Sequence, residues 1–182
     1  PAPTTASSSR STTLLEREPD MARNFYISDA ASRYMDHLNR TSRSGKIEYR
    51  LHFWWLCAQV GLLKNNSSET VSNARDMVDH FDIGPLRASQ NYIRALLLMQ
   101  HIRDVDAGGM DRGMIEGIMQ QTMTSESASR LTEDGSKLLD RYAETGFRFI
   151  REEIGPQDEL KDFLREYHNL LERLGGSESP LK

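Results

Sequence analysis

The sequence predicts an all-α protein, a single-domain bundle of about six or seven helices with a disordered N-terminal arm. From residue 28 onward apolar residues recur at intervals of three and four, the spacing of one face of an α-helix. A sustained alternation of apolar and polar residues is lacking, and only 24–28 (NFYIS) reads as a short extended piece. We place the arm at 1–24, the helical domain at 25–175 and a disordered tail at 176–182.

The amino-acid composition indicates which class of protein the chain belongs to. Charged residues make up 27% of the chain and hydrophobic residues 37%, which fits a solvated helical protein. Cys57 is the only cysteine, so an internal disulfide and a cysteine metal cluster are both excluded. This favours a reducing compartment, with the cytoplasm as the expected location. The first twenty residues contain no long apolar segment, so we expect no secretory signal there.

The charge is unevenly distributed. A net charge of -4 argues against broad nonspecific binding to nucleic acid. Residues 1–64 nevertheless carry 9 Lys+Arg against 6 Asp+Glu, a balance of +3, which leaves -7 for residues 65–182. The first third could meet an anionic ligand and the remainder a basic partner. The alternative is that these charges only solvate helix faces.

The first predicted helix occupies ISDAASRYMDHLNR. Ser28 is its N-cap, and Ala31, Tyr34, Met35 and Leu38 form its apolar face. RTSRSG then ends it with small polar residues and a glycine.

Residues 46–63 form the most apolar stretch. Its apolar core, Phe53 to Val60, is broken by Gln59 and is far shorter than the ~20 residues of a membrane span, so we expect no membrane contact. Apolarity on nearly all sides predicts a central helix with neighbours packed around it. Adjacent residues on a helix point about 100° apart, so Trp54 and Trp55 can lie one in the core and one at an edge or interface.

Three further helices are predicted in the middle of the chain. They occupy 68–81, where Val71 to Phe81 show helical spacing, then 85–105 after Pro85, and 110–123. The last is rich in methionine, which suits either core packing or an adaptable protein-binding surface.

The last two helices have the clearest apolar stripes. One begins at Thr132 and ends before Gly155 and Pro156, and the other runs from 158 to Gly175. The short connection between them predicts an antiparallel helical hairpin.

The search for catalytic chemistry yields no site. DAGGMDRG lacks the Lys-Ser/Thr ending of a P-loop, and no histidine belongs to an HExxH pattern. Asp76 with His80, and His168 with Glu172, have i,i+4 spacing but are ordinary surface pairs. Cys57 lies in the most apolar helix, where cysteine is usually a small buried hydrophobe. We therefore expect no enzyme, no metal and no cofactor.

The strongest candidate site lies in residues 33–50. Helix, short polar turn and helix bring together basic residues and hydroxyls, an arrangement suited to nucleic-acid phosphates. The basic residues are Arg33, Arg40, Arg43, Lys46 and Arg50. Asp36 and Glu48 lower the net positive charge of this segment. The alternative is an ordinary solvated connection between helices.

The same region carries a resemblance. ISDAASRYMDHLNRTSRSG followed by HFWWLCAQVGL resembles the opening of the small DndE-type proteins of prokaryotic DNA phosphorothioation systems, and LLDRYAETGFRFI looks like a helix near that family's end. The resemblance implies a compact helical, non-catalytic accessory protein that associates with the DNA backbone and self-associates or joins a modification or defence complex. Arg40, Arg43 and Lys46 would carry DNA binding, flanked by Arg33 and Arg50.

Two functional hypotheses follow. The first is an accessory subunit that binds nucleic acid, with DNA favoured, through residues 33–50 and protein partners elsewhere. The second is a structural or adaptor subunit without nucleic-acid contact. For a protein interface the expected residues are Met114, Met119, Met123 and Trp54.

Overall fold

A computed structural model describes residues 24–67, 70–71, 73–78, 80–105, 109 and 111–176. The predicted N-terminal arm, apart from residue 24, and the predicted C-terminal tail, apart from residue 176, lie outside the described residues. None of the helices in the described ranges combines the length and the apolar character that crossing a membrane requires.

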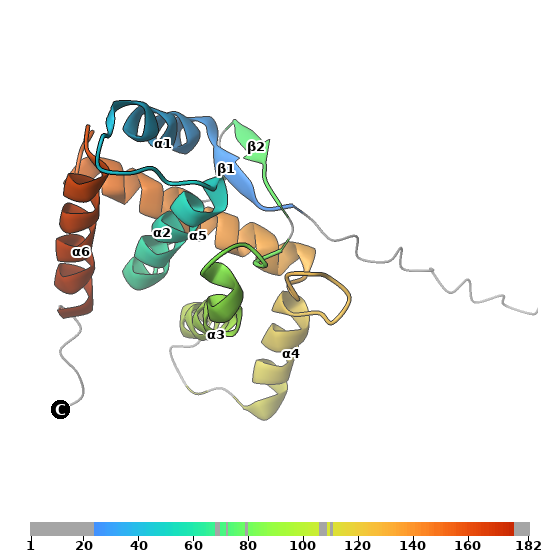
Figure 1. The fold of residues 1–182 in the computed structure, drawn as a ribbon. Helices are drawn as coiled ribbons and strands as arrows, with labels where there is room; N and C mark the ends of the chain where they lie inside the picture. Colours follow the sequence, from blue (N-terminus) through green and yellow to red (C-terminus); the bar gives the residue numbers. More distant parts are fainter. Residues whose placement is uncertain are drawn as a thin grey trace, which may run out of the picture.

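The prediction of an all-α fold is confirmed. Six helices and one small sheet are seen in the described part of the chain (Figure 1). The elements in order are β1 (Tyr26–Ser28), α1 (Asp29–Thr41), α2 (Arg50–Lys64), β2 (Ala74–Asp76), α3 (Leu86–Val105), α4 (Arg112–Thr122), α5 (Glu133–Glu153) and α6 (Leu160–Gly176).

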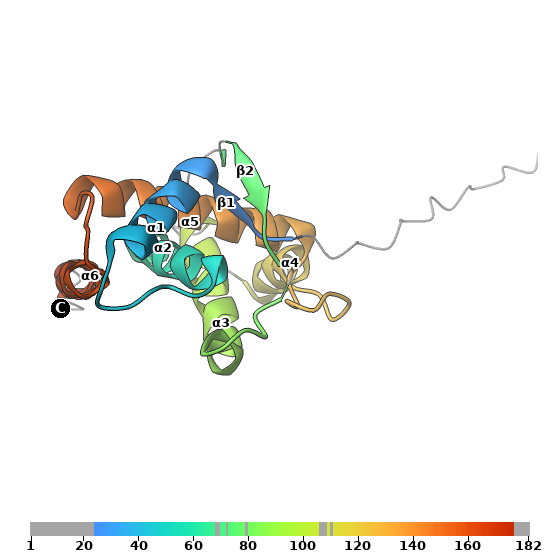
Figure 2. The ribbon, with the colours of Figure 1, turned by 45° about the horizontal axis from the view of Figure 1, so that its top comes forward.

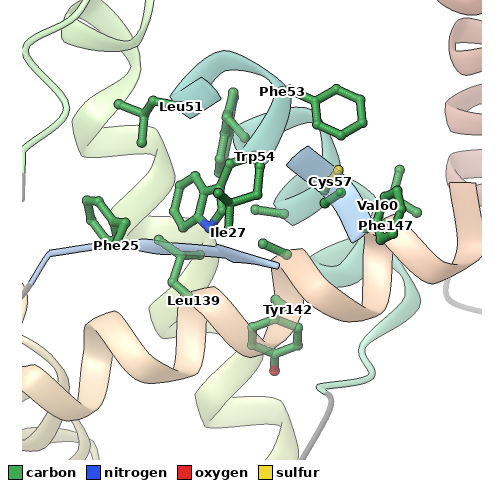
Figure 3. Close-up of a cluster of buried hydrophobic side chains, with 14 of the residues drawn as sticks. Phe25, Ile27, Leu51, Phe53, Trp54, Cys57, Val60, Leu139, Tyr142 and Phe147 are labelled. Carbon is green, nitrogen blue, oxygen red and sulfur yellow. The ribbon is translucent and has the colours of Figure 1, made fainter. Parts of the chain in front are cut away.

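Helix α2 is the centre of the molecule, as its all-round apolarity predicts. It packs mainly along α5, with β1 closing one end of the core and α3 and α6 approaching from other sides (Figures 1 and 3). Trp54, Cys57 and Val60 of α2 share this core with Leu139 and Phe147 of α5. Removing such side chains from water is the main stabilising contribution to the fold.

Side-chain caps set where several helices begin. Ser28 Oγ accepts from Ala31 N at the start of α1, and Thr132 Oγ1 accepts from Gly135 N at the start of α5. Asp111 caps α4 in the same way through Met114 N. Each cap satisfies an amide that has no partner inside the helix.

The helix predicted over 68–81 is wrong. Residues 74–76 form β2, which pairs antiparallel with β1, so that Tyr26 lies opposite Asp76. The pairing continues beyond the strands through Met77 N, which donates to Phe25 O at 2.9 Å. Asn73 has a φ of 47°, a conformation that interrupts a helix. Backbone partners offered by a distant segment therefore outweigh the local apolar spacing.

The antiparallel hairpin predicted for the last two helices is also wrong. Gly155, with a φ of 71°, lies in the connection, and α6 then runs across the direction of α5; Figure 2 shows α6 end-on. Helix α6 packs against α2 instead, and Tyr167 Oη donates to Leu56 O at 2.9 Å. The apolar stripe on α6 therefore completes the core around α2.

Candidate nucleic-acid interface

The basic segment, residues 33–50, comprises most of α1, the 42–49 connection and the first residue of α2. Arg33, His37 and Arg40 are separated by four and three residues, so they share one face of α1. Both arginines are exposed on that face. Arg43 and Lys46 are exposed on the connection, which Figure 2 shows looping from α1 to α2.

Asn39 holds the connection against α1. Its Nδ2 donates to Ile47 O at 2.8 Å, and its Oδ1 accepts from Ile47 N at 2.8 Å. These paired bonds imitate a backbone ladder, and Ile47 is buried beneath them. The backbone next to Lys46 is therefore fixed by the fold.

Glu159, in the connection before α6, binds the turn at residues 42–44. Its Oε2 accepts from Arg43 N at 3.0 Å and from Ser44 N at 3.1 Å. In return Ser42 Oγ accepts from Leu160 N at 3.0 Å, and Ser44 Oγ accepts from Lys161 N at 3.1 Å. The two segments thus cap each other reciprocally.

These contacts shift the pKa of Glu159. Hydrogen bonding from Ser44, together with the Arg43 and Ser44 amides and the Ser42 hydroxyl, lowers the pKa of the Glu159 carboxyl against a smaller opposing effect of desolvation. The turn amides therefore already hold an anion. A phosphate at the basic segment would be bound by side chains rather than by these amides.

Two of the five predicted basic residues have partners inside the protein. Arg50 Nη2 lies 3.6 Å from Asp36 Oδ1, and Arg50 Nε donates to Ser32 Oγ at 3.1 Å. Arg40 Nη2 lies 3.4 Å from His37 Nδ1, whose ring also contacts Asp158. Arg50 is therefore partly neutralised.

The other three, Arg33, Arg43 and Lys46, form no ion pair with any described residue. Their side chains come from α1 and from the connection, and all three residues are exposed. Exposed cations without acidic partners are available to an anionic ligand.

The role of Glu159 was not predicted from the sequence, and the role predicted for two serines is different in the structure. The hydroxyls of the polar turn were expected to help bind phosphate, but those of Ser42 and Ser44 cap the start of α6. Glu159 is separated from Ser42 by 117 residues, and no local pattern links the two positions.

The predicted partner-interface residues divide into three groups. Met114 and Met119 on α4 are 48% and 43% exposed, whereas Met123 is half-buried against the core. Trp54 is 1% exposed, so the interface expected there is corrected to a core position. Because Trp54 faces β1 and α5, a partner cannot reach it without opening the core.

A cavity of about 630 Å³ with a mixed polar and apolar lining, beside the N-terminal half of α5, was not predicted. Lys137, Arg141, Asp134 and Asp140 of α5 line it, with His101 of α3 opposite. His101 Nδ1 lies 3.1 Å from Thr122 Oγ1. Both signs of charge are present, so the lining does not select a ligand of one charge.

The i,i+4 pairs considered for metal binding have ordinary roles or do not form. Asp76 lies in β2 and His80 after it, so they do not share a helix face. His168 Nε2 and Glu172 Oε1 lie 3.3 Å apart on the surface of α6. Within the described ranges, no group of three or more His, Cys, Asp or Glu residues is placed to hold a metal ion.

Comparison with known proteins gives no relative: no family model matches the chain, and no similar curated protein or solved structure is found.

Proposed function

We propose that this chain is a non-catalytic helical accessory protein that binds nucleic-acid phosphates through the basic segment. The resemblance of that segment to DndE-type proteins favours DNA and a prokaryotic DNA-modification or defence setting. Phosphate contacts by arginine and lysine supply most of the affinity in sequence-independent binding.

One observation carries the proposal. Arg33, Arg43 and Lys46 are exposed on neighbouring parts of one segment, and their side chains form no ion pair with any described residue. Several other exposed arginines form ion pairs with acids, as Arg112 does with Glu116 at 2.7 Å. The proposal therefore rests on three such cationic side chains within fourteen residues of the chain, from 33 to 46.

The test is fluorescence anisotropy with a labelled oligonucleotide at several salt concentrations. Changing Arg33, Arg43 and Lys46 together to Ala should weaken binding and reduce the slope of log K against log salt by about 2 to 3. The matched control changes Arg112, Arg165 and Arg173 to Ala, which removes the same charge from paired surface sites. An equal loss in both variants contradicts the assignment to the basic segment.

A second candidate function is protein binding through α3 and α4. Tyr92 and Met99 of α3 are seven residues apart on one face and exposed, and Met114 and Met119 of α4 are exposed as well. Exposed large apolar side chains of this kind mark interaction surfaces. A solution mass above the 20.8 kDa monomer that returns to the monomer value in a Met99→Lys variant supports this function.

A further inference from the structure

A groove of about 440 Å³ borders the basic segment. It lies between the first turns of α2 and α3 and the start of α6. Its apolar lining comprises Ile47, Trp55, Leu56, Leu86, Leu160 and Leu164. Leu164 is 45% exposed, so an apolar wall stands open to solvent. An apolar concavity of this size suits a small flat group rather than a folded domain.

The groove is continuous with the proposed phosphate-binding surface. Lys46 belongs to the basic segment and also lines the groove. The neighbouring Ile47 is held in place by its two bonds to Asn39. A nucleic-acid backbone whose phosphate binds Lys46 would therefore bring the neighbouring sugar and base to the opening of the groove.

The polar groups of the groove suit an uncharged ligand with a polar edge. Lys46 and Glu48 bring opposite charges, and Ser89 adds a hydroxyl group. The His52 ring also lines the groove and packs edge-on against Tyr49, and its Nε2 is buried beside Gly84.

We propose that the nucleic acid bound by the basic segment is single-stranded and that one of its bases enters this groove. This inference rests on the proposed function. A nucleobase has apolar faces for the Leu and Trp side chains and a hydrogen-bonding edge for the Ser89 hydroxyl and the Glu48 carboxylate, while its phosphate reaches Lys46. A base inside a duplex would first have to unstack, and the free energy of unstacking opposes its entry into the groove.

The experiment compares two labelled oligonucleotides of equal length by anisotropy, one with bases and one abasic. Their phosphate charge is the same, so binding by phosphates alone gives equal affinities. We expect the abasic strand to bind about tenfold more weakly, about 1.4 kcal/mol, because the stacking of one base is lost. A duplex of the same length should also bind more weakly than the single strand.

The variant Leu164→Ala removes the exposed wall of the groove. It should lower affinity for the base-bearing strand and leave affinity for the abasic strand unchanged. Leu63→Ala is the matched control, since Leu63 is 42% exposed on α2 and does not line the groove. Equal binding of base-bearing and abasic strands overturns the groove assignment but leaves the proposed function standing. Absence of binding to either strand and to the duplex overturns the proposed function as well.

Discussion

Gly61 of α2 and Gly146 of α5 lie against each other where the two central helices cross. A Cβ atom at Gly146 would lie 1.8 Å from Cys57 O and 2.7 Å from Gly61 N, and one at Gly61 would lie 1.9 Å from Tyr142 O. The two backbones are therefore in direct contact, and only glycine leaves room for this crossing.

Gly146→Ala should destabilise the protein. The added methyl group has to push α2 and α5 apart, and overpacking of this kind costs about 1–3 kcal/mol or more. The loss should appear as a lower midpoint of urea unfolding. Gly117→Ala on α4 is the control, because nothing lies within 4 Å of its Cβ position. That change should raise stability by about 0.5–1 kcal/mol through helix propensity. Similar effects at the two sites would contradict the close crossing.

Glu159 should titrate below its ordinary pKa of 4.5 in the folded protein. Because folding lowers this pKa, the stabilisation is present above pH 4.5 and is lost as pH falls through the folded-state pKa. NMR titration of the Glu159 carboxyl measures the value directly. Ser44→Ala should move it upward toward 4.5, whereas Ser125→Ala, at an exposed site on another loop, should not. An unchanged value in Ser44→Ala would refute the reciprocal capping.

Arg94 should be important for stability although it lies outside the proposed sites. Its buried guanidinium donates from Nε to Ser129 O, from Nη1 to Asn91 Oδ1 and from Nη2 to Gln90 Oε1, each at 2.8 Å. Arg94→Met should lower the free energy of unfolding by about 1–3 kcal/mol, because the buried Ser129 carbonyl loses its donor.

Two further variants test this role of Arg94. Arg94→Lys should not restore stability, since one ammonium cannot serve three acceptors in a fixed fork. Arg87→Met, on the same helix with a side chain that is 73% exposed, should change stability by less than about 0.5 kcal/mol. Urea unfolding of the three variants makes the comparison, and full stability of Arg94→Lys would contradict the forked contact.

Cys57 should react slowly with thiol reagents in the folded protein. Burial raises the pKa of its thiol, and the nearby Glu144 carboxylate raises it further, so little thiolate forms at pH 8. Labelling by a chromogenic disulfide should be about a hundredfold or more slower than in urea-unfolded protein, because it requires opening of the core. Equal rates would show that the core around α2 is open to solvent.

Local spacing was sufficient to predict most helices, but not the partners of individual residues. Ser28 and Thr132 were expected to begin helices and do so, because a cap bonds within three residues of itself. The exposed basic residues of the candidate site could likewise be found from composition. Glu159 could not, because its bonds to the 42–44 turn join segments that are distant in sequence.

The sequence by itself determined the helical class, the central place of α2 and the ends of α1, α4 and α5, since these follow from periodicity, apolarity and capping over a few residues. Only the tertiary structure decided that residues 74–76 pair with β1, that α6 packs against α2, and that Trp54 is buried in the core. These outcomes depend on hydrogen bonds and packing surfaces supplied by distant segments, and local propensity yields to such partners when they satisfy the backbone and bury more apolar area.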